Sequence, residues 1–369
     1  MNRMKLGEIL SVKHGWAFKG EYFAEDGEQS ILTPGNFFEK GGFKPNNGKE
    51  RYYTGTYPKE YLCHKGDLIV AMTQQAEGLL GSTALVPENN KYLHNQRIGL
   101  ITCDEKRLNK LFAYYLFMTK SVREQLERSS SGTKVKHTSP EKIYDVEVEI
   151  PDVISQQKIA NLLWAIDEKI ANNKAINDNL SAMAYDIYMH TFFSKKPNAK
   201  LKDILTEAEK SAIQVGEAKT SNGEYPFFTS GATILKWNEP FVDGRNCFLN
   251  TGGNADVKFY VGKAAYSTDT WSISAKSEMS DYLYLMLFSI KSELDQKFFQ
   301  GTGLKHLQKP LLKDRPIYIP EKMELEGFNR QVMPMFDIIS ENTRENQQLT
   351  SLRDWLLPML MNGQATISD

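Results

Sequence analysis

Cysteine is scarce in this sequence, and long apolar runs are missing. The three cysteines show no Cys-x-x-Cys spacing, which argues against a disulfide framework and a zinc knuckle. No apolar run approaches the roughly 18 residues of a membrane-spanning helix. The segment Met1–Phe18 also lacks the apolar stretch of a signal peptide. We therefore expect a cytoplasmic protein without a metal site.

The signatures of common catalytic sites are also missing. No G-x-x-x-x-G-K-[ST] loop is present, which argues against an ATP-driven motor. The Asn/Asp-Pro-Pro-aromatic motif of amino-methyltransferases is absent, and the six histidines stand at no metal-ligand spacing. No serine lies in a nucleophile-elbow pattern. We expect no catalytic residue and no cofactor in this chain.

The composition is that of a folded protein with several domains. The chain has 369 residues, of which 41% are hydrophobic, a length that suits two or three domains. Its 45 basic and 46 acidic residues give no overall basic excess. Binding to nucleic acid depends on local potential, so this balance does not exclude it.

An internal repeat organises the chain. The segment Gly132-Thr133-Lys134-Val135-Lys136-His137 returns as Gly301-Thr302-Gly303-Leu304-Lys305-His306, an offset of 169 positions (301 − 132). The same offset pairs Asp145 with Asp314, Ile150-Pro151 with Ile319-Pro320, Asn173 with Asn342, Asn177 with Asn346 and Leu180 with Leu349. A weaker echo joins Lys5–Leu10 to Lys200–Leu205. The order is block, tail, block, tail.

The two tails show helical periodicity. From Ser155 to about Phe193, the apolar residues are Ile159, Leu163, Ile166, Ile170, Ile176, Leu180, Met183 and Ile187. The second tail repeats the stripe with Val332, Met335, Ile339, Leu349, Leu352, Leu356 and Leu360. Pro334 predicts a kink or a late start of the second helix, and Pro358 a kink or an end.

A long helix with one apolar stripe needs a partner, and the obvious partner is its duplicate. We predict an antiparallel coiled coil, which would place the two blocks at opposite ends of a rod. Its seam contains Ile166, Ile170, Asn173, Leu180, Ile187, Met335, Ile339, Asn342, Leu349 and Leu356. The asparagines at 173, 177, 342 and 346 either fix the register or lie solvated beside the seam.

The pattern of the two blocks predicts β-rich domains. Short apolar runs such as Asp67–Met72, Gly99–Thr102, Cys247–Leu249 and Val257–Val261 alternate with turn clusters. One helix is predicted in each block, over Leu108–Arg128 and Asp281–Phe299. The fold class is therefore α+β, with a first β-rich domain at 1–151, a first long helix at 152–195, a second β-rich domain at 196–320 and a second long helix at 321–369.

A polar loop with cations follows the predicted helix of each block. Hydroxyls, glycine backbone and lysines suit phosphate oxygens. The candidate phosphate contacts are Thr133, Lys134, Lys136, His137, Thr302, Lys305 and His306. The alternative is a helix C-cap followed by a solvated loop.

The whole arrangement resembles the DNA sequence specificity (S) subunits of type I restriction-modification enzymes. The resemblance rests on the order of blocks and tails and on the repeated Gly-Thr-x-x-Lys-His … Ile-Pro transition. Gly66–Ala71, Gly81 and Asn95-Gln96 also match a pattern of the first recognition domain.

The resemblance implies a noncatalytic subunit that reads a split double-stranded DNA target. It also implies docking of two methyltransferase (modification) subunits and of restriction (nuclease/translocase) subunits. S-adenosylmethionine, ATP and Mg would belong to those partners. A rod of some 50 Å would hold two heads at least one DNA turn apart, about 34–36 Å.

Base reading requires side chains that donate or accept hydrogen bonds at base edges. The candidates in the first block are Lys13, His14, Trp16, Lys19, Thr73, Gln74 and Gln75. Those in the second block are Lys236, Arg245, Asn254, Thr268 and Asp269. The aromatics Phe37, Phe38, Tyr52, Tyr53, Phe227 and Phe228 are expected to fill cores. The alternative function is a coiled-coil scaffold whose two β-rich heads bind protein or glycan.

Overall fold

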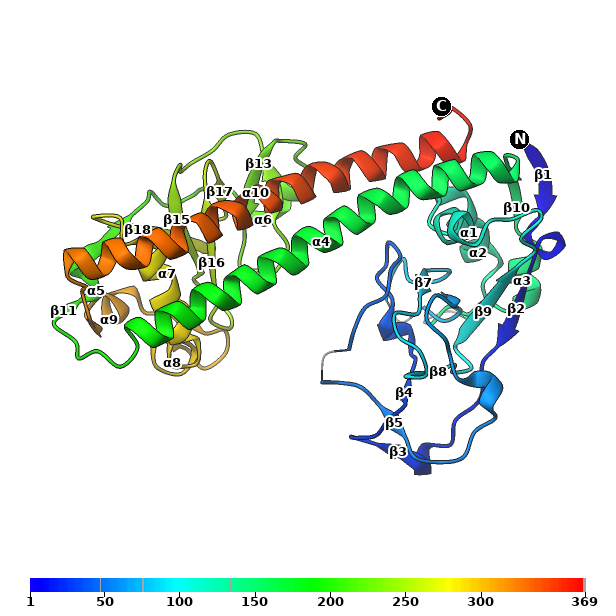
Figure 1. Cartoon of the computed structure of the whole chain (residues 1–369), viewed down its shortest axis with the longest axis horizontal. Coiled ribbons are helices and arrows are strands. Elements are labelled where there is room, and N and C mark those ends of the chain that lie inside the picture. Colours follow the sequence, from blue (N-terminus) through cyan, green and yellow to red (C-terminus); the bar gives the residue numbers. More distant parts are fainter. Residues whose placement is uncertain (47, 75, 133–134, 368–369) are drawn as a thin grey trace. The chain divides into compact units, whose positions relative to one another are not determined.

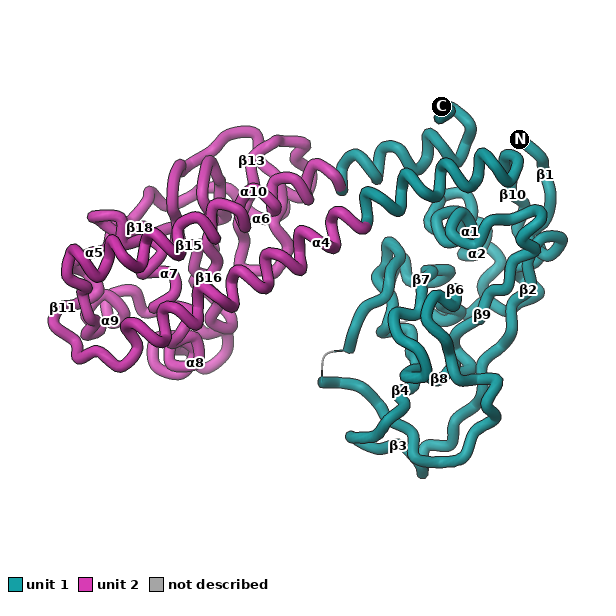
Figure 2. Tube along the Cα trace, viewed as in Figure 1, with its two compact units in different colours: residues 1–167, 350–369 teal, residues 168–349 magenta. Residues whose placement is uncertain are grey.

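We describe the chain from a computed structural model that places residues 1–46, 48–74, 76–132 and 135–367. The chain divides into two compact units (Figure 2), with residues 1–167 and 350–369 in unit 1 and residues 168–349 in unit 2. Each unit contains one β-rich head and a segment of each of two long helices (Figure 1). The fold is α+β, as the sequence predicts.

Head 1, in unit 1, is built on two small sheets. The central sheet is antiparallel with the order β2-β9-β6-β7, and the second has the order β3-β5-β4-β8 with β4 and β8 parallel. The strands are β1 (Asn2–Lys5), β2 (Leu10–His14), β3 (Phe23–Ala24), β4 (Ser30–Ile31), β5 (Tyr52–Tyr53), β6 (Leu68–Ala71), β7 (Thr83–Leu85), β8 (Tyr92–Leu93), β9 (Ile98–Cys103) and β10 (Glu147–Ile150). β1 pairs with β10.

The run Asp67–Met72 is apolar because strand β6 is buried on both faces. Leu68 and Val70 pack into the core beneath the helices, whereas Ile69 and Ala71 face a second core. Alternate side chains of a strand point to opposite sides, so burial on both sides requires a continuous apolar segment.

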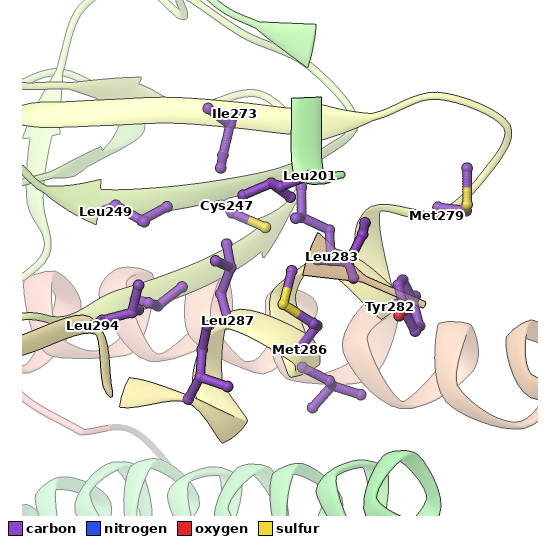
Figure 3. Packing of buried hydrophobic residues seen from close by; sticks show 14 of the residues in the cluster. Leu201, Cys247, Leu249, Ile273, Met279, Tyr282, Leu283, Met286, Leu287 and Leu294 are labelled. Carbon is purple, nitrogen blue, oxygen red and sulfur yellow. The ribbon is translucent and has the colours of Figure 1, made fainter. Parts of the chain in front are cut away.

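Head 2, in unit 2, repeats this topology. Its central sheet is antiparallel with the order β12-β18-β15-β16, and its second sheet has the order β14-β13-β17 with β13 and β17 parallel. The strands are β11 (Ala199–Lys200), β12 (Leu205–Glu207), β13 (Tyr225–Phe228), β14 (Leu235–Trp237), β15 (Arg245–Asn250), β16 (Val257–Val261), β17 (Ala265–Tyr266), β18 (Thr270–Ala275), β19 (Phe299–Gln300), β20 (His306–Leu307) and β21 (Pro316–Ile317). Figure 3 shows Cys247 and Leu249 of β15 packed against Leu283 and Leu287.

The single helix predicted in each block is interrupted. In head 1, the predicted helix Leu108–Arg128 is two helices, α1 (Lys110–Leu116) and α2 (Lys120–Ser129). They separate where the Thr119 hydroxyl caps α2 by accepting from the Val122 amide. In head 2, the predicted helix divides into α7 (Ser280–Ser289), α8 (Lys291–Glu293) and a π-helical turn, η5 (Leu294–Phe298).

The remaining short helices lie in the heads. They are α3 (Pro140–Tyr144), α5 (Leu201–Ile204), α6 (Val215–Lys219) and α9 (Lys309–Lys313), with 3₁₀ turns η1 (Leu6–Glu8), η2 (Gly20–Tyr22), η3 (Pro34–Asn36) and η4 (Lys59–Tyr61). They close the connections between strands and leave the sheets as the framework of each head.

Two helices of about equal length carry the repeated tails. Helix α4 spans Val153–Thr191 and α10 spans Lys322–Met361. The expectation of a late start at Pro334 is wrong, because α10 begins twelve positions earlier and continues through Pro334. It ends three residues after Pro358. The missing amide of a proline interrupts only one hydrogen bond, and packing in unit 2 keeps the flanking Val332 and Phe336 buried.

Four asparagines from α4 and α10 form a hydrogen-bonded layer in unit 2. Asn173 Nδ2 donates to Asn346 Oδ1 at 3.0 Å, and Asn342 Nδ2 donates to Asn177 Oδ1 at 2.8 Å. Asn173 and Asn342 are equivalent in the repeat, and so are Asn177 and Asn346. Each of the two hydrogen bonds is thus the repeat equivalent of the other, and the layer has pseudo-two-fold symmetry. Residue numbers rise on one helix as they fall on the other, so the two helices are antiparallel.

Main-chain acceptors complete the layer. Asn177 Nδ2 donates to the Ile339 carbonyl and Asn346 Nδ2 to the Ile170 carbonyl, each at 3.3 Å. The structure places the ten proposed seam residues in buried or half-buried positions. Three other members of the stripes, Ile176, Met183 and Leu352, are exposed and lie outside the seam.

The start of each head is fixed in the same way. Lys5 Nζ lies 2.9 Å from Asp145 Oδ1, and Lys200 Nζ lies 3.3 Å from Asp314 Oδ1. In each head, a lysine from the repeated segment at the start of the block therefore contacts an aspartate from the repeated segment near its end. The same ion pair occurs in both heads.

Candidate nucleic-acid interface

In each head, the loop after the inner strand of the central sheet is paired with the polar loop that follows the helices. In head 1, the Gln74 amide donates to the Lys136 carbonyl at 2.9 Å. In head 2, the Gly253 amide donates to the Lys305 carbonyl at 3.0 Å. We call residues 72–74 and 76–78 with 130–132 and 135–137 the loop pair of head 1, and residues 251–256 with 300–306 the loop pair of head 2.

The lysine of each loop pair is bound to a carboxylate. Lys136 pairs with Glu127 of α2, and Lys305 Nζ lies 2.9 Å from Asp295 Oδ2 of the π-helical turn. The other candidate phosphate contacts divide into three exposed residues and two outside the described chain. His137, Thr302 and His306 are exposed, whereas Thr133 and Lys134 lie outside the described residues, as does Gln75.

The structure brings part of the second reading set together. A cleft at the loop pair of head 2 is lined by Asn250, Asn254, Asp256, Asp269, Lys291 and His306. Thr268 is adjacent to Asp269 in sequence, but neither Thr268 nor Lys236 lines this cleft. Of the second-block candidates, Asn254 and Asp269 thus share one concave surface with His306.

Arg245 does not belong to the reading set. Its guanidinium is largely buried and binds both carboxylate oxygens of Asp281, at 2.6 and 3.0 Å. It also lies 2.6 Å from Asp337 Oδ1 and donates to the Met333 carbonyl at 2.7 Å. Burial raises the pKa of Asp281 to about 6, and Arg245 opposes that shift. Arg245 is a structural link between β15, α7 and α10.

Thr73, another candidate base reader, is buried, and its hydroxyl lies 3.0 Å from His137 Nδ1. Gln74 is half-buried at the same loop. Among the core aromatics, Phe38 is a wrong prediction: its ring is exposed. Tyr52 is half-buried, and Phe37, Tyr53, Phe227 and Phe228 are buried as predicted.

The candidates at the end of β2 lie on an exposed aromatic surface. Lys13 Nζ lies 4.3 Å from the Tyr61 ring centroid and 3.4 Å from Glu60 Oε2. The Trp16 ring is exposed and lies 5.3 Å from that of Tyr61. His14 and Lys19 are exposed. Exposed aromatic and basic groups in one place suit contacts with nucleic acid.

Head 1 also has a basic cleft, which the sequence did not predict although the resemblance included its residues Asn95 and Gln96. It is lined by Asn46, Lys49, Arg51, Asn95, Gln96 and Arg97. Among the described residues, the three cations of this cleft form no ion pair, and their side chains are exposed. The polar run Asn95-Gln96-Arg97 before the buried strand β9 is the signal that could have identified it.

The turn that carries Gln96 and Arg97 is held rigidly at its backbone. The Trp16 amide donates to the His94 carbonyl at 2.8 Å, and the Gln96 amide donates to the Trp16 carbonyl at 3.1 Å. The Met72 amide binds the Arg97 carbonyl at 3.0 Å. The backbone is thus fixed while the two side chains remain exposed, an arrangement that lowers the entropic cost of binding.

His94 gives head 1 a specific dependence on pH. Its ring is buried with Nε2 2.8 Å from the Ile98 carbonyl, and burial lowers its pKa to about 4. The unfolded chain takes up a proton near pH 6.5, whereas the folded chain does not, so stability present above pH 6.5 is lost as the pH falls toward 4. The expected loss is about 1.4 kcal/mol per pH unit.

Urea denaturation between pH 7 and 5 checks this prediction. His94→Gln retains a donor for the Ile98 carbonyl but does not titrate, so its stability should fall less over this range than that of the wild type. An identical pH dependence in both proteins would remove His94 as the cause.

Other kinds of site find no support in the described residues. In the part of the chain that the structure places, no three His, Cys, Asp or Glu side chains group as metal ligands. Over the same residues, no helix has both the length and the apolar character needed to cross a bilayer.

Two heads of one topology, each with a loop pair and a cleft of different lining, define a duplicated recognition protein. The family model described as "Type I restriction modification DNA specificity domain" matches residues 1–182 and 195–351. The chain belongs to this family and is a specificity subunit with two recognition domains.

Similar proteins agree with this assignment. The chain is 22% identical to the type I restriction enzyme MjaIX specificity subunit of Methanocaldococcus jannaschii, over 70% of this chain and 69% of that protein. It is also 22% identical to the HindI specificity subunit of Haemophilus influenzae, over 69% and 77%. The crystal structure of a type I restriction-modification S subunit from M. genitalium has the same fold, with a TM-score of 0.67, 15% identity and coverage of 100% of this chain and 96% of that one.

Proposed function

We propose that this chain is a noncatalytic subunit that reads an asymmetric, two-part DNA target, one part with each head. The observation that carries the proposal is that the two heads share a topology and a loop pair but have clefts at different places, lined in head 1 by strands β3 and β4 and in head 2 by the loop pair. Related scaffolds with different clefts suit two unlike half-sites around an unspecified gap.

The cleft linings favour different bases. The head 1 cleft presents Arg51, Arg97 and Lys49, donors that suit the O6 and N7 acceptors of guanine. The head 2 cleft presents Asp269 and amides, which suit the exocyclic amino groups of cytosine and adenine, whereas Asp256 in the same cleft is paired with Lys291. We therefore expect a guanine in the part of the target that head 1 reads.

The long helices offer a repeated surface for partner subunits. Ile154 and Met323, which are 169 positions apart, are 73% and 86% exposed. Met183 and Leu352, at the same offset, are 53% and 44% exposed. Apolar side chains exposed at equivalent positions of a pseudo-symmetric pair suit two copies of one partner.

We assign these partners as two methyltransferase subunits, with restriction subunits joining the complex. S-adenosylmethionine, ATP and Mg would then act in the partners. This chain would select the DNA sequence and position the partner subunits on it.

Single substitutions in the head 1 cleft distinguish residues that recognise a base from residues that bind the DNA backbone electrostatically. Arg97→Ala should relax the choice of one base pair by about 1–3 kcal/mol, because a bidentate contact is lost. Lys49→Ala should weaken binding to all sequences alike and lower the salt slope by about 0.9, the value for one phosphate contact. The measurement is affinity for a panel of single-base target variants at several salt concentrations.

The target for this panel comes from mapping methylated bases in the host genome. Lys120→Ala is the matched control, because Lys120 is exposed and pairs with Glu124 within α2. If Arg97→Ala lost affinity equally for every variant, Arg97 would be a phosphate contact and not a base reader.

A salt titration of the assembled complex decides between this function and the scaffold alternative. DNA reading predicts sequence-dependent binding that falls steeply as salt rises. A scaffold with heads that bind protein or glycan predicts no such slope.

A further inference from the structure

Two carboxylates lie beside the lysines that are the candidate phosphate contacts of the loop pairs, and negative charge there opposes the proposed function. Glu127 pairs with Lys136 in head 1, and Asp295 pairs with Lys305 in head 2. The feature recurs in both repeats although its details differ. By the offset of 169, Glu127 corresponds to Gln296, so the carboxylate of head 2 stands one position away and on a shorter side chain.

We propose that Glu127 and Asp295 are specificity-determining residues that neutralise the loop lysines until a target is docked. Each carboxylate holds its lysine in the free protein and so weakens attraction to DNA of arbitrary sequence. This inference rests on the proposed DNA-reading function and adds a means of suppressing binding to non-target DNA.

The position of the lysines explains why pairing there matters. The carbonyls of Lys136 and Lys305 accept from the Gln74 and Gly253 amides, so each lysine joins the two members of a loop pair. Asp295 is itself fixed, because its Oδ1 accepts from the Ala255 amide at 2.9 Å. The Lys305 side chain and this amide lower the pKa of Asp295, which keeps it ionised at neutral pH.

The two carboxylate–lysine ion pairs are weak enough to break when target DNA binds. All four side chains are partly exposed, between 32% and 53%. Such pairs contribute about 0–1 kcal/mol, so base contacts made in a correct complex suffice to release the lysine to a phosphate. In a loosely bound complex, no base contacts offset even this small cost, and the lysines stay paired.

The salt dependence of binding distinguishes this role from simple bracing of the loops. Each phosphate neutralised adds about 0.9 to the slope of log affinity against log salt. With the chain assembled with its methyltransferase partners, and with a short duplex that lacks the target, Glu127→Gln and Asp295→Asn should each steepen the slope by about 0.9. Affinity for this duplex at low salt should rise about two- to fivefold in each variant.

Binding to a duplex that contains the mapped target gives the second arm. Its salt slope, measured in the complex with methyltransferase partners, should stay unchanged, because the lysines already contact phosphate there. Glu124→Gln is the matched control: it removes one negative charge from α2, but Glu124 pairs with Lys120 and Arg128 of the same helix. It should leave both slopes unchanged.

Lysine variants test the mechanism directly. In a Lys136→Ala background, Glu127→Gln should no longer steepen the slope for non-target DNA. Unchanged non-target slopes in both carboxylate variants, or weaker binding to both duplexes, would overturn the proposal and leave the carboxylates as braces. If the wild-type complex bound neither duplex, the proposed function itself would fail, and this result is distinct from either outcome.

Discussion

Arg245→Ala is expected to destabilise unit 2 by about 3–5 kcal/mol, the range found when one partner of a buried ion pair is removed. Asp281 is fully buried and would lose both of its guanidinium contacts. The Met333 carbonyl and Asp337 would lose their partner as well. The head would thereby lose a direct attachment of its central sheet to α10.

Amide hydrogen exchange followed by mass spectrometry is the suitable measurement, because it resolves unit 2 from unit 1. Strands β15 and β18 should exchange faster in the variant. Lys291→Ala serves as the control, since it breaks an exposed pair with Asp256 and should cost about 1 kcal/mol or less. Adding Asp281→Asn to Arg245→Ala should recover part of the loss. Protection of β15 equal to the wild type would refute the structural role of Arg245.

Gly15→Ala is expected to disrupt the recognition surface of head 1. A Cβ at this position would lie 2.1 Å from the Asn95 carbonyl oxygen and 2.3 Å from its carbon. Main-chain atoms cannot rotate away, so the segment after β2 must separate from the turn that carries Gln96 and Arg97. We expect a cost of at least about 1–3 kcal/mol, as for overpacking, together with weaker DNA binding.

Gly20→Ala is the matched control, because a Cβ at Gly20 meets no atom within 4 Å. Thermal unfolding and DNA affinity, measured on both variants, check the prediction. A Gly15→Ala protein that is as stable as Gly20→Ala and binds DNA equally well would show that the close approach to Asn95 is dispensable.

Features that depend on local periodicity or on duplication were predictable from the sequence. The two long helices follow from their apolar stripes, and the repeat at a fixed offset predicted two related heads. The sequence alone did not decide whether the asparagines at 173 and 177 fix the register of the helix pair or lie solvated beside the seam. Only their placement opposite Asn346 and Asn342 shows that they bond across the seam.

Features that join distant segments were not predictable. Arg245 resembled a base reader because its partners, Asp281 and Asp337, lie 36 and 92 positions away. The basic cleft of head 1 combines Lys49 and Arg51 with Arg97 from a separate segment, and no short motif links them. The break between α1 and α2 depends on a threonine cap inside an otherwise continuous helical pattern.

The division into units has a consequence for biosynthesis. Unit 2 is one continuous stretch, whereas unit 1 combines residues 1–167 with residues 350–369. Leu360 and Met361 lie in the same core as Leu6 and Phe112. During translation, the core of head 1 therefore lacks Leu360 and Met361 until the whole of unit 2 has been synthesised.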